Sequence, residues 1–293
     1  MPNLKEIRTR ISSITTTLQV TSAMKMVSSA KLKKAQRSIM QMRPYADKLK
    51  EIVSIISNDN DTEEENPFTK LMDPNNILIV VVSSDSGLCG AFNSNIIRTA
   101  LSLADKKYHT QYISGKVNFL SIGKQGKKIL KAKKTPIIEQ IDNFFDTLDF
   151  EHSQELSTKI TDLFIAKKYD HIEIVYNAFK NAASQICTSE QFLPILPSIQ
   201  NEKEKEKNNN IDFIFEPSRQ EILEEILPRS LKIQFYSVLL DSFAAEQGAR
   251  MTAMSQATDN ATDLIKKLNL QFNKARQSAI TNEIIEVTSG TMA

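Results

Sequence analysis

Two glycine-containing segments are where the residue types and spacing of this sequence could support chemistry. Ser84–Asn93 (SDSGLCGAFN) follows an apolar run, and a turn at the carboxyl end of a strand is where α/β sheets bind ligands. Gly123–Lys128 (GKQGKK) suggests a phosphate loop, but Ser121 stands where a Walker A motif needs its first glycine. Neither segment has the G-x-G-x-x-G spacing of a dinucleotide site. We therefore expect a structural turn at Ser84–Asn93 and the start of a basic helix at Gly123–Lys128.

The cysteines and histidines are too few and too scattered to predict a cofactor site. Cys89 and Cys187 exclude a disulfide scaffold and a four-cysteine zinc site. His109, His152 and His171 lack any metal-binding spacing. Cys89 has no histidine nearby in the sequence to activate it, so we expect it to be a small buried hydrophobe. The sequence thus predicts no metal, no cofactor and no catalytic residue.

The composition is that of a folded chain with long elements. The 293 residues are 41% hydrophobic and 25% charged, and 37 basic against 35 acidic residues exclude a strongly basic nucleic-acid coat. Only seven residues are glycine, so few tight turns are expected. No run of 18 apolar residues predicts a membrane span. The length suggests about two domains.

The charge is unevenly distributed along the chain. Residues 1–50 hold eleven basic and two acidic residues, and the remainder holds 26 basic and 33 acidic ones. The basic arm includes Lys31, Lys33, Lys34 and Arg37. These side chains suit nucleic-acid phosphates, an anionic membrane or an acidic protein, and composition alone leaves these alternatives open.

The first 57 residues predict one long helix whose apolar residues form a coiled-coil seam. The seam steps alternately by three and four residues, and we expect a phase shift at Val20, Met24 and Val27. Pro44 predicts a local bend, and the acidic stretch 58–66 is expected to end the helix. The two runs are Leu4, Ile7, Ile11, Ile14 and Leu18, then Leu32, Ala35, Ile39, Met42, Ala46, Leu49, Val53 and Ile56.

Residues 218–293 predict a second long helix. Between Arg229 and Thr288 there is no proline and one glycine, Gly248. Small residues on one ridge let a partner helix approach closely. At 1.5 Å per residue we expect both terminal helices to be roughly 80–90 Å long, and this match favours pairing with each other. The ridge consists of Ala245, Ala249, Ala253, Ala257 and Ala261.

Residues 75–200 alternate between strand-like and helix-like patterns. Alternation of this kind predicts a mostly parallel sheet with helices on both faces. The fold class is therefore α/β: a long antiparallel coiled coil of the two terminal helices with a central Rossmann-like α/β domain. The expected strands are Ile77–Ser83, Val117–Ile122 and His171–Asn177, with edges at Ile186–Leu193 and Ile211–Phe215, and the expected helices lie near 93–106, 123–132 and 151–168.

Particular residues at both ends resemble the gamma subunit of F-type ATP synthase. The similarity begins by Lys5, so we expect no transit peptide and a bacterial origin. The chain departs from the family pattern at Ser86, where a charged residue or Gln is common, and at Phe215, where Tyr is common. The matching segments are Lys5–Arg8, Thr21–Val27, Arg43–Tyr45, Ser84–Gly90, Glu246–Met254, Ala257–Ala261, Asn273, Arg276–Gln277, Ile280–Thr281, Glu283, Glu286 and Ser289–Gly290.

The resemblance implies a rotary role rather than catalysis. The paired helices would be the shaft inside a hexamer of alpha and beta subunits, and the base would sit on the c ring beside epsilon. Proton flow would turn the ring and shaft, and the shaft would drive the catalytic beta subunits. One copy per complex is implied, peripheral to the membrane through the c ring, on the cytoplasmic face of the bacterial inner membrane. No nucleotide or nucleic acid would bind.

The resemblance also implies contact residues. Phe215 and Glu216 would lie at the foot near the c ring, and the basic arm would face acidic loops of beta. The positions implied to face beta are Met24, Arg250, Arg276, Gln277, Thr281 and Glu283.

Two other function classes remain as alternatives. A coiled-coil nucleic-acid binder would lose affinity steeply with added salt. A small-molecule enzyme built on the α/β part would be stabilised by its ligand.

Overall fold

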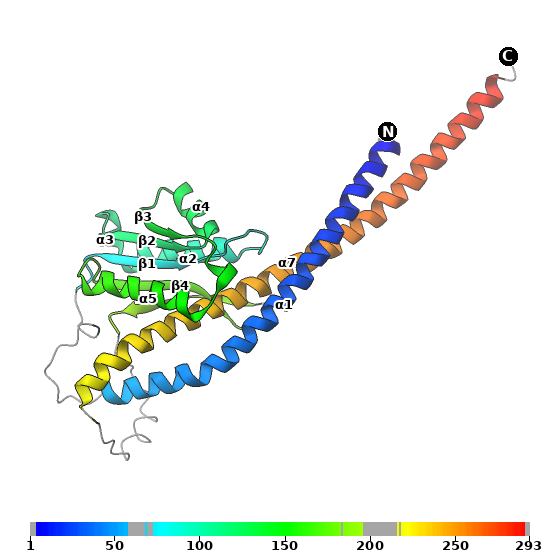
Figure 1. The fold of residues 1–293 in the computed structure, drawn as a ribbon. Helices are drawn as coiled ribbons and strands as arrows, with labels where there is room; N and C mark the ends of the chain where they lie inside the picture. Colours follow the sequence, from blue (N-terminus) through cyan, green and yellow to red (C-terminus); the bar gives the residue numbers. More distant parts are fainter. Residues whose placement is uncertain are drawn as a thin grey trace. The chain divides into compact units, whose positions relative to one another are not determined.

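The computed structural model has a long helix at each end of the chain and a central sheet, as the sequence predicts (Figure 1). It describes residues 4–57, 68, 73–182, 184–195, 216 and 218–290. The acidic stretch 58–66, the loop Asn201–Asn210 and the expected strand Ile211–Phe215 lie outside the described residues. In chain order the elements are α1 (Leu4–Ser57), β1 (Ile77–Val82), α2 (Phe92–Lys107), α3 (His109–Ile113), β2 (Val117–Ile122), α4 (Lys124–Ala132), β3 (Ile137–Ile141), the 3₁₀ helix η1 (Phe144–Thr147), α5 (Phe150–Ile165), β4 (His171–Phe179), β5 (Gln185–Leu193) and α7 (Arg219–Gly290).

Two compact units divide the chain, and each long helix contributes to both. The helix-pair unit comprises Met1–Ala30 with Arg250–Ala293, and the α/β unit comprises Lys31–Ala249. In the α/β unit the strand order is β3-β2-β1-β4-β5. The first four strands are parallel neighbours and β5 is antiparallel to β4. The mostly parallel sheet predicted from the sequence is therefore confirmed.

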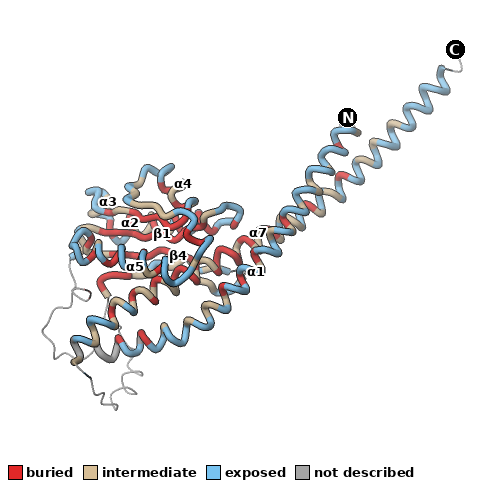
Figure 2. The backbone as a smooth tube through the Cα atoms, viewed as in Figure 1, coloured by how far each residue is buried: buried red, intermediate tan, exposed pale blue. Residues whose placement is uncertain are grey.

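The central strand β1 is buried on both faces. All six of its residues are fully buried, and Figure 2 shows the strands as the buried layer of the α/β unit. Leu78, Val80 and Val82 join one core with α5 and α7, whereas Ile77 and Ile79 join a second core with α2 and α4. Alternating side chains reach opposite faces, so a continuous β-branched run is what a doubly covered strand requires.

Three short elements were not expected from the sequence: α3, β3 and η1. The strand Ile137–Ile141 is five residues long, follows Pro136 and carries a register irregularity beside Phe119 and Leu120. Short elements carry too few residues to establish a period. What positions β3 is its pairing with β2, which only the fold supplies.

The terminal helices are unequal, contrary to the expected match in length. Helix α1 has 54 residues and α7 has 72. Helix α7 starts at Arg219, within one residue of the start expected at 218, and it runs through Pro228. Proline inside a helix costs about 3 kcal/mol, but Leu227 and Leu231 on either side are fully buried in the core. Burial of two leucines offsets that cost. Helix α1 likewise continues through Pro44.

Candidate functional site

The two helices of the helix-pair unit run antiparallel. The Oγ1 atoms of Thr21 and Thr258 lie 2.9 Å apart, and Lys25 Nζ donates to Ser255 Oγ at 3.0 Å. A step of four residues along α1 thus matches a step of three backwards along α7. Each hydroxyl also has a carbonyl of its own helix within reach, since Thr21 can donate to Leu18 and Thr258 to Met254. Because each hydroxyl carries one proton, one threonine donates its hydrogen bond across the helix pair and the other donates to a carbonyl of its own helix.

The expected phase shift in the α1 seam is wrong. Val20 is 52% exposed and Val27 is 56% exposed, whereas Thr21 and Ser28 are buried. The three-and-four stepping instead continues from Leu18 through the buried Thr21 and Ser28, with the exposed Lys25 between them reaching across to Ser255. Polar side chains can occupy these positions because Thr21 and Lys25 find hydrogen-bond partners on α7. A search for apolar residues alone misses a seam of this kind.

The alanine ridge of α7 is only partly a helix-pairing surface. Ala245 is fully buried in the core beside Cys89, Phe92 and Val175, and a Cβ on Gly248 would lie 3.2 Å from the Ala182 carbonyl oxygen. This part of the ridge packs against the sheet of the α/β unit, which corrects the expectation of a partner helix there. In the helix-pair unit the buried apolar residues of α7, within its described part, are Met254, Ala261 and Leu268, seven residues apart.

The end of α7 extends past the described start of α1. From the register of Thr21 with Thr258, Leu4 lies at the level of about residue 275 in a pair of straight helices. All residues from 280 to 290 are exposed. The exposed fractions of the large apolar side chains are 46% for Ile280, 58% for Ile284, 58% for Ile285 and 68% for Val287.

The residues implied to face beta lie in different environments. Arg276, Gln277, Thr281 and Glu283 are exposed, and the Thr281 hydroxyl donates to the Gln277 carbonyl one turn earlier. Met24 is half-buried, and Arg250 is buried with 7% exposed. Of the expected foot residues, Glu216 is exposed and Phe215 lies outside the described residues. The basic arm residues Lys31, Lys33, Lys34 and Arg37 are exposed.

The loop after β1 is held by its own hydrogen bonds. The side chain of Asn93 makes three of these bonds: its Oδ1 accepts from Ser84 N, and its Nδ2 donates to Ser84 Oγ and to the sulfur of Cys89. Cys89 is buried, as the sequence predicts. Its thiol is thus a packed and bonded part of the turn rather than an exposed nucleophile.

The start of α4 has no open anion cradle. The first three backbone N–H groups of the helix all have acceptors. Lys124 N donates to the Asp85 carboxylate, Gln125 N to the Ser84 carbonyl and Gly126 N to Ser83 Oγ. A Cβ on Gly126 would lie 2.5 Å from Ser83 Oγ. The glycine therefore serves close packing of α4 on β1 and not phosphate binding.

The crevice where doubly wound sheets bind ligands is filled by α7. Such ligands lie beyond the carboxyl ends of the strands, where the strand order reverses, which here is between β1 and β4. Ala245 packs against Val175 of β4 and Cys89 of the loop after β1, and Gly248 packs against Ala182 after β4. A helix segment occupies the position that a nucleotide would take.

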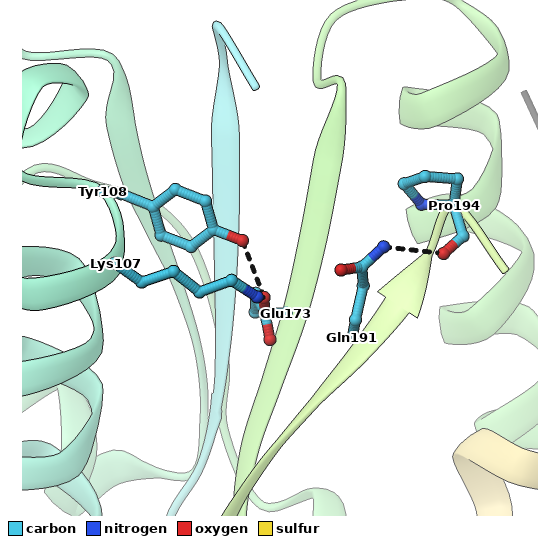
Figure 3. A network of polar contacts seen from close by, with 5 residues as sticks. All are labelled: Lys107, Tyr108, Glu173, Gln191 and Pro194. Atoms are coloured by element: carbon cyan, nitrogen blue, oxygen red, sulfur yellow. Dashed lines mark hydrogen bonds and ion pairs between the residues drawn. The ribbon is translucent and has the colours of Figure 1, made fainter. Parts of the chain in front are cut away.

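A polar cluster that the sequence did not reveal lies at the other end of the sheet. Figure 3 shows Lys107, the last residue of α2, and Tyr108, which follows it, reaching Glu173 of β4. Glu173 is buried, forms an ion pair with Lys107, and accepts a hydrogen bond from the Tyr108 hydroxyl at 2.7 Å. Burial, and then the bond to Glu173, raise the pKa of Tyr108 above its usual value, so the phenol stays neutral. The ion pair and the hydrogen bond tie the end of α2 to the sheet.

The signal for this cluster was a charge in a core strand. Glu173 interrupts the apolar run of His171–Asn177 at a position that faces α2. Beside it, Gln191 of β5 pairs with Glu173 in the strand register and donates to the Pro194 carbonyl at 2.9 Å (Figure 3). Among the described residues there is no group of three His, Cys, Asp or Glu suited to a metal ion. Within the described segments no helix is long and apolar enough to cross a membrane.

Known proteins similar to this chain agree on one family. The ATP synthase family model matches residues 3–293. The ATP synthase gamma chain of Flavobacterium psychrophilum is 48% identical, and that of Cytophaga hutchinsonii is 44% identical. Each similarity covers 100% of this chain and 99% of the relative.

Solved structures show the same fold. A chain of the Tetrahymena thermophila mitochondrial ATP synthase central stalk and c ring is 26% identical with a TM-score of 0.59, covering 81% of this chain and 99% of that one. A chain of the Euglena gracilis mitochondrial ATP synthase, solved with OSCP, F1 and the c ring, is 19% identical with a TM-score of 0.66, covering 99% and 93%. With its paired helices, filled crevice and full-length relatives, the chain belongs to the ATP synthase gamma chain family.

Proposed function

We propose that this chain is the central-stalk rotor subunit of an F-type ATP synthase and transmits torque between a c ring and a catalytic alpha/beta hexamer. Proton flow turns the ring, the helix pair turns with it, and the turning helices change the nucleotide affinities of the beta subunits. The chain itself binds no nucleotide and performs no bond chemistry. The packing of Cys89, the start of α4 and the filled crevice all support a non-catalytic role.

The observation that carries the proposal is the exposed apolar end of α7. Ile280, Ile284, Ile285 and Val287 are each at least 46% exposed on a helix segment past the described start of α1. Contiguous exposed apolar surface marks an interaction site. A collar of alpha and beta subunits around this segment would cover it, and a smooth apolar end could turn there without directional bonds.

Contacts that must be made and released on each turn should be individually modest. Exposed ion pairs contribute about 0–1 kcal/mol each. We infer that the basic arm from Lys31 to Arg37 meets acidic loops of beta in this way. Met24, Arg250, Arg276, Gln277, Thr281 and Glu283 are proposed as further beta contacts. Phe215 and Glu216 are proposed as contacts with the c ring, and epsilon as a neighbour at the base. One copy per complex would then lie on the cytoplasmic face of the bacterial inner membrane.

Arg276 offers the sharpest residue test. Its planar guanidinium can hold a carboxylate through two hydrogen bonds, which a lysine cannot do. We expect Arg276→Ala to assemble normally but to lower ATP hydrolysis and its coupling to proton transport, and Arg276→Lys to recover part of the loss. A charge-assisted hydrogen bond is worth about 1.5–3 kcal/mol, or roughly tenfold to a hundredfold in an equilibrium constant.

The experiment compares ATPase rate and ATP-driven proton pumping in membranes with matched complex content. A tag on this chain should also bring down alpha, beta, epsilon and c subunits. Lys274→Ala is the matched control, because Lys274 is an exposed cation on the same turn for which no contact is proposed. Wild-type rates and pumping in Arg276→Ala would refute the Arg276 contact, and absence of the other subunits from the tagged preparation would refute the rotor assignment.

A further inference from the structure

One edge of the sheet in the α/β unit gathers lysines and isoleucines from three separate connections. Strands β1 to β4 are parallel, so the connections that enter β2, β3 and β4 meet at the edge where these strands begin. We call this group the amino-edge surface. Its members are all exposed, and they are Ile113 and Lys116 before β2, Lys133 and Lys134 before β3, and Ile165, Lys167 and Lys168 before β4.

The same backbone turn ends the helix in each of the three connections. A residue with positive φ follows each helix: Gly115 at 73°, Lys134 at 57° and Lys167 at 55°. This residue and the next one both donate their N–H groups back into the helix, which is the Schellman motif, where glycine is the usual residue. The bonds run from Gly115 to Tyr112 and Lys116 to Gln111, from Lys134 to Lys131 and Thr135 to Leu130, and from Lys167 to Phe164 and Lys168 to Leu163.

Lysine in two of these turns lowers the stability of the folded chain. The left-handed region is unfavourable for a residue with a side chain, and glycine adopts it freely. Gly115 makes the same turn without this strain. A cation near the end of a helix is attracted to the helix dipole, but a lysine one turn earlier would have that attraction without the strain. Strained residues of this kind are concentrated at binding sites.

The charge of the amino-edge surface is available to a partner. Among the described residues, no carboxylate forms an ion pair with any of its five lysines. Two acidic residues at this edge are bonded elsewhere within the chain. The Asp170 carboxylate accepts from Asn76 N at 2.9 Å, and Glu173 pairs with Lys107.

Helix α7 passes from this edge of the sheet to the opposite one. Phe235 contacts Phe192, whose neighbour Leu193 pairs with the start of β4, at 5.8 Å between ring centroids. Eight residues later, Phe243 stacks at 5.9 Å on Phe145, which follows the end of β3. The start of α7, next to Glu216, therefore lies on the side of the amino edge. A surface on the same side as the proposed c-ring contact would face the bilayer, and this step rests on the proposed function.

We propose that the amino-edge surface docks on the anionic headgroups of a phospholipid bilayer. The lysines lie at the starts of β2, β3 and β4, which with β1 between them span three strand spacings, about 14 Å. Clusters of lysine are attracted to anionic lipid, and a broad array of point charges fits a diffuse negative surface. Ile113 is 73% exposed and Ile165 is 50% exposed, and both would enter the headgroup region.

Two other occupants fit the amino-edge surface less well. A single carboxylate of an acidic protein is best held by the planar fork of an arginine, and the surface contains only lysines. Single-stranded nucleic acid is bound by stacking on aromatic side chains, and the surface contains none.

The test reads which edge of the full-length chain meets a vesicle. An environment-sensitive fluorophore is attached at Ser114→Cys, at the amino edge, or at Ser86→Cys, in the loop at the opposite edge, with Cys89 and Cys187 replaced by alanine. Both serines are exposed. Vesicles of phosphatidylcholine with phosphatidylglycerol should shift the emission to the blue at Ser114→Cys and not at Ser86→Cys. Phosphatidylcholine alone, or high salt, should give no shift.

Glycine substitutions separate lipid binding from folding. Lys134→Gly/Lys167→Gly relieves the strain of two turns, so it should raise the Tm. It should nevertheless weaken vesicle binding about twenty-five-fold, because each lysine near an anionic surface contributes about fivefold. Gly115→Lys should do the reverse: a Cβ there meets nothing within 4 Å, so binding should strengthen about fivefold while the strained φ lowers the Tm.

A matched variant controls for total charge. Lys124→Gln/Lys128→Gln removes two exposed lysines at the start of α4, at the opposite edge, and should leave vesicle binding unchanged. Co-purification of alpha and beta subunits with Lys134→Gly/Lys167→Gly reports separately on the proposed function and should be normal. No shift at Ser114→Cys, equal shifts at both positions, or unchanged affinity in Lys134→Gly/Lys167→Gly would overturn the lipid proposal.

Discussion

Thr21 and Thr258 meet across the helix pair with 2.9 Å between their Oγ1 atoms, although 237 residues separate them in the chain. Together with the bond from Lys25 to Ser255, this contact sets the antiparallel register of the two helices. Polar residues within an apolar seam specify register at a cost in stability. The exposed length of α7 follows from this register.

The register predicts which introduced cysteines can pair. Leu18 precedes Thr21 by three residues and Ala261 follows Thr258 by three, so they lie at the same level of an antiparallel pair. Leu18→Cys with Ala261→Cys should form a disulfide under mild oxidation, measured on non-reducing gels in a chain with Cys89 and Cys187 replaced by alanine.

The negative control for this register is Arg10→Cys with Ile285→Cys. By the same register Arg10 lies opposite about residue 269, so this pair should stay reduced. Preferential bridging of Arg10→Cys with Ile285→Cys would show that the helices pair in a different register.

Gly126 is predicted to tolerate no side chain. In Gly126→Ala the new Cβ would lie 2.5 Å from Ser83 Oγ and 2.6 Å from Ser121 Oγ. Ser83 cannot move cheaply, because its hydroxyl accepts from Gly126 N and is bonded to the Ile122 carbonyl. Overpacking of this kind costs about 1–3 kcal/mol, which urea denaturation of the α/β unit within the full chain would measure.

Gly87→Ala is the matched control for Gly126→Ala. A Cβ at Gly87 meets nothing within 4 Å, so the free energy of unfolding should change by less than about 0.5 kcal/mol. Equal stability of the two variants would contradict the packing account of α4.

Lys107 is predicted to matter because its partner is buried. Lys107→Met would leave the Glu173 carboxylate with the Tyr108 hydroxyl but without its cation. Removal of one member of a buried pair costs about 3–5 kcal/mol, and because the Lys107 side chain is 47% exposed we expect a reduced loss of about 1–3 kcal/mol. Chemical denaturation would measure it.

A second substitution should reverse most of that loss. Lys107→Met/Glu173→Gln removes the buried charge while keeping an acceptor for Tyr108, so it should be more stable than Lys107→Met alone. A double variant no more stable than Lys107→Met would mean that the lysine acts through packing of its stem and not through its charge.

Asp241 gives the α/β unit a predicted pH dependence. Burial raises the pKa of the Asp241 carboxyl, with the Arg43 guanidinium opposing and the Glu190 carboxylate adding to the shift. The folded chain therefore holds this proton to a higher pH than the unfolded chain does. The stability that this proton provides is present below the ordinary value of 3.8 and is lost as the pH rises through the folded-state pKa.

Asp241→Asn should remove this loss. Its Tm should exceed that of the wild-type chain at pH 7, and the difference should vanish near pH 3, where both side chains are neutral. Asp162→Asn, at an exposed position on α5, is the control and should show no such pH-dependent gain. A lower Tm for Asp241→Asn at pH 7 would mean that the ionised group is stabilised by Arg43.

The sequence predicted the elements that carry long periodic patterns. The run from Ile77 was sufficient to place β1, and the seam residues before Leu18 and after Leu32 were sufficient to place α1. The seam between them was misassigned because Thr21 and Lys25 are polar, and their partners Thr258 and Ser255 are identified only by three-dimensional pairing.

Among the polar sites, too, the sequence predicted one correctly and missed another. Spacing alone argued against a phosphate loop at Gly123–Lys128, and the structure supplies the physical reason in the bonds to Ser83, Ser84 and Asp85. The cluster around Glu173 was missed because its members lie 65 and 66 residues apart.

Rotation of the chain inside the assembled complex tests the central claim most directly. With the alpha/beta hexamer fixed to a surface and a visible probe attached through Ile113→Cys, a position that is 73% exposed, addition of ATP should produce continuous rotation in one direction. The rotation should stop when ATP is withdrawn and when Val20, an exposed residue of α1, is crosslinked to a beta subunit. ATP hydrolysis at the normal rate while the probe stays still would contradict the assignment of this chain as the rotor.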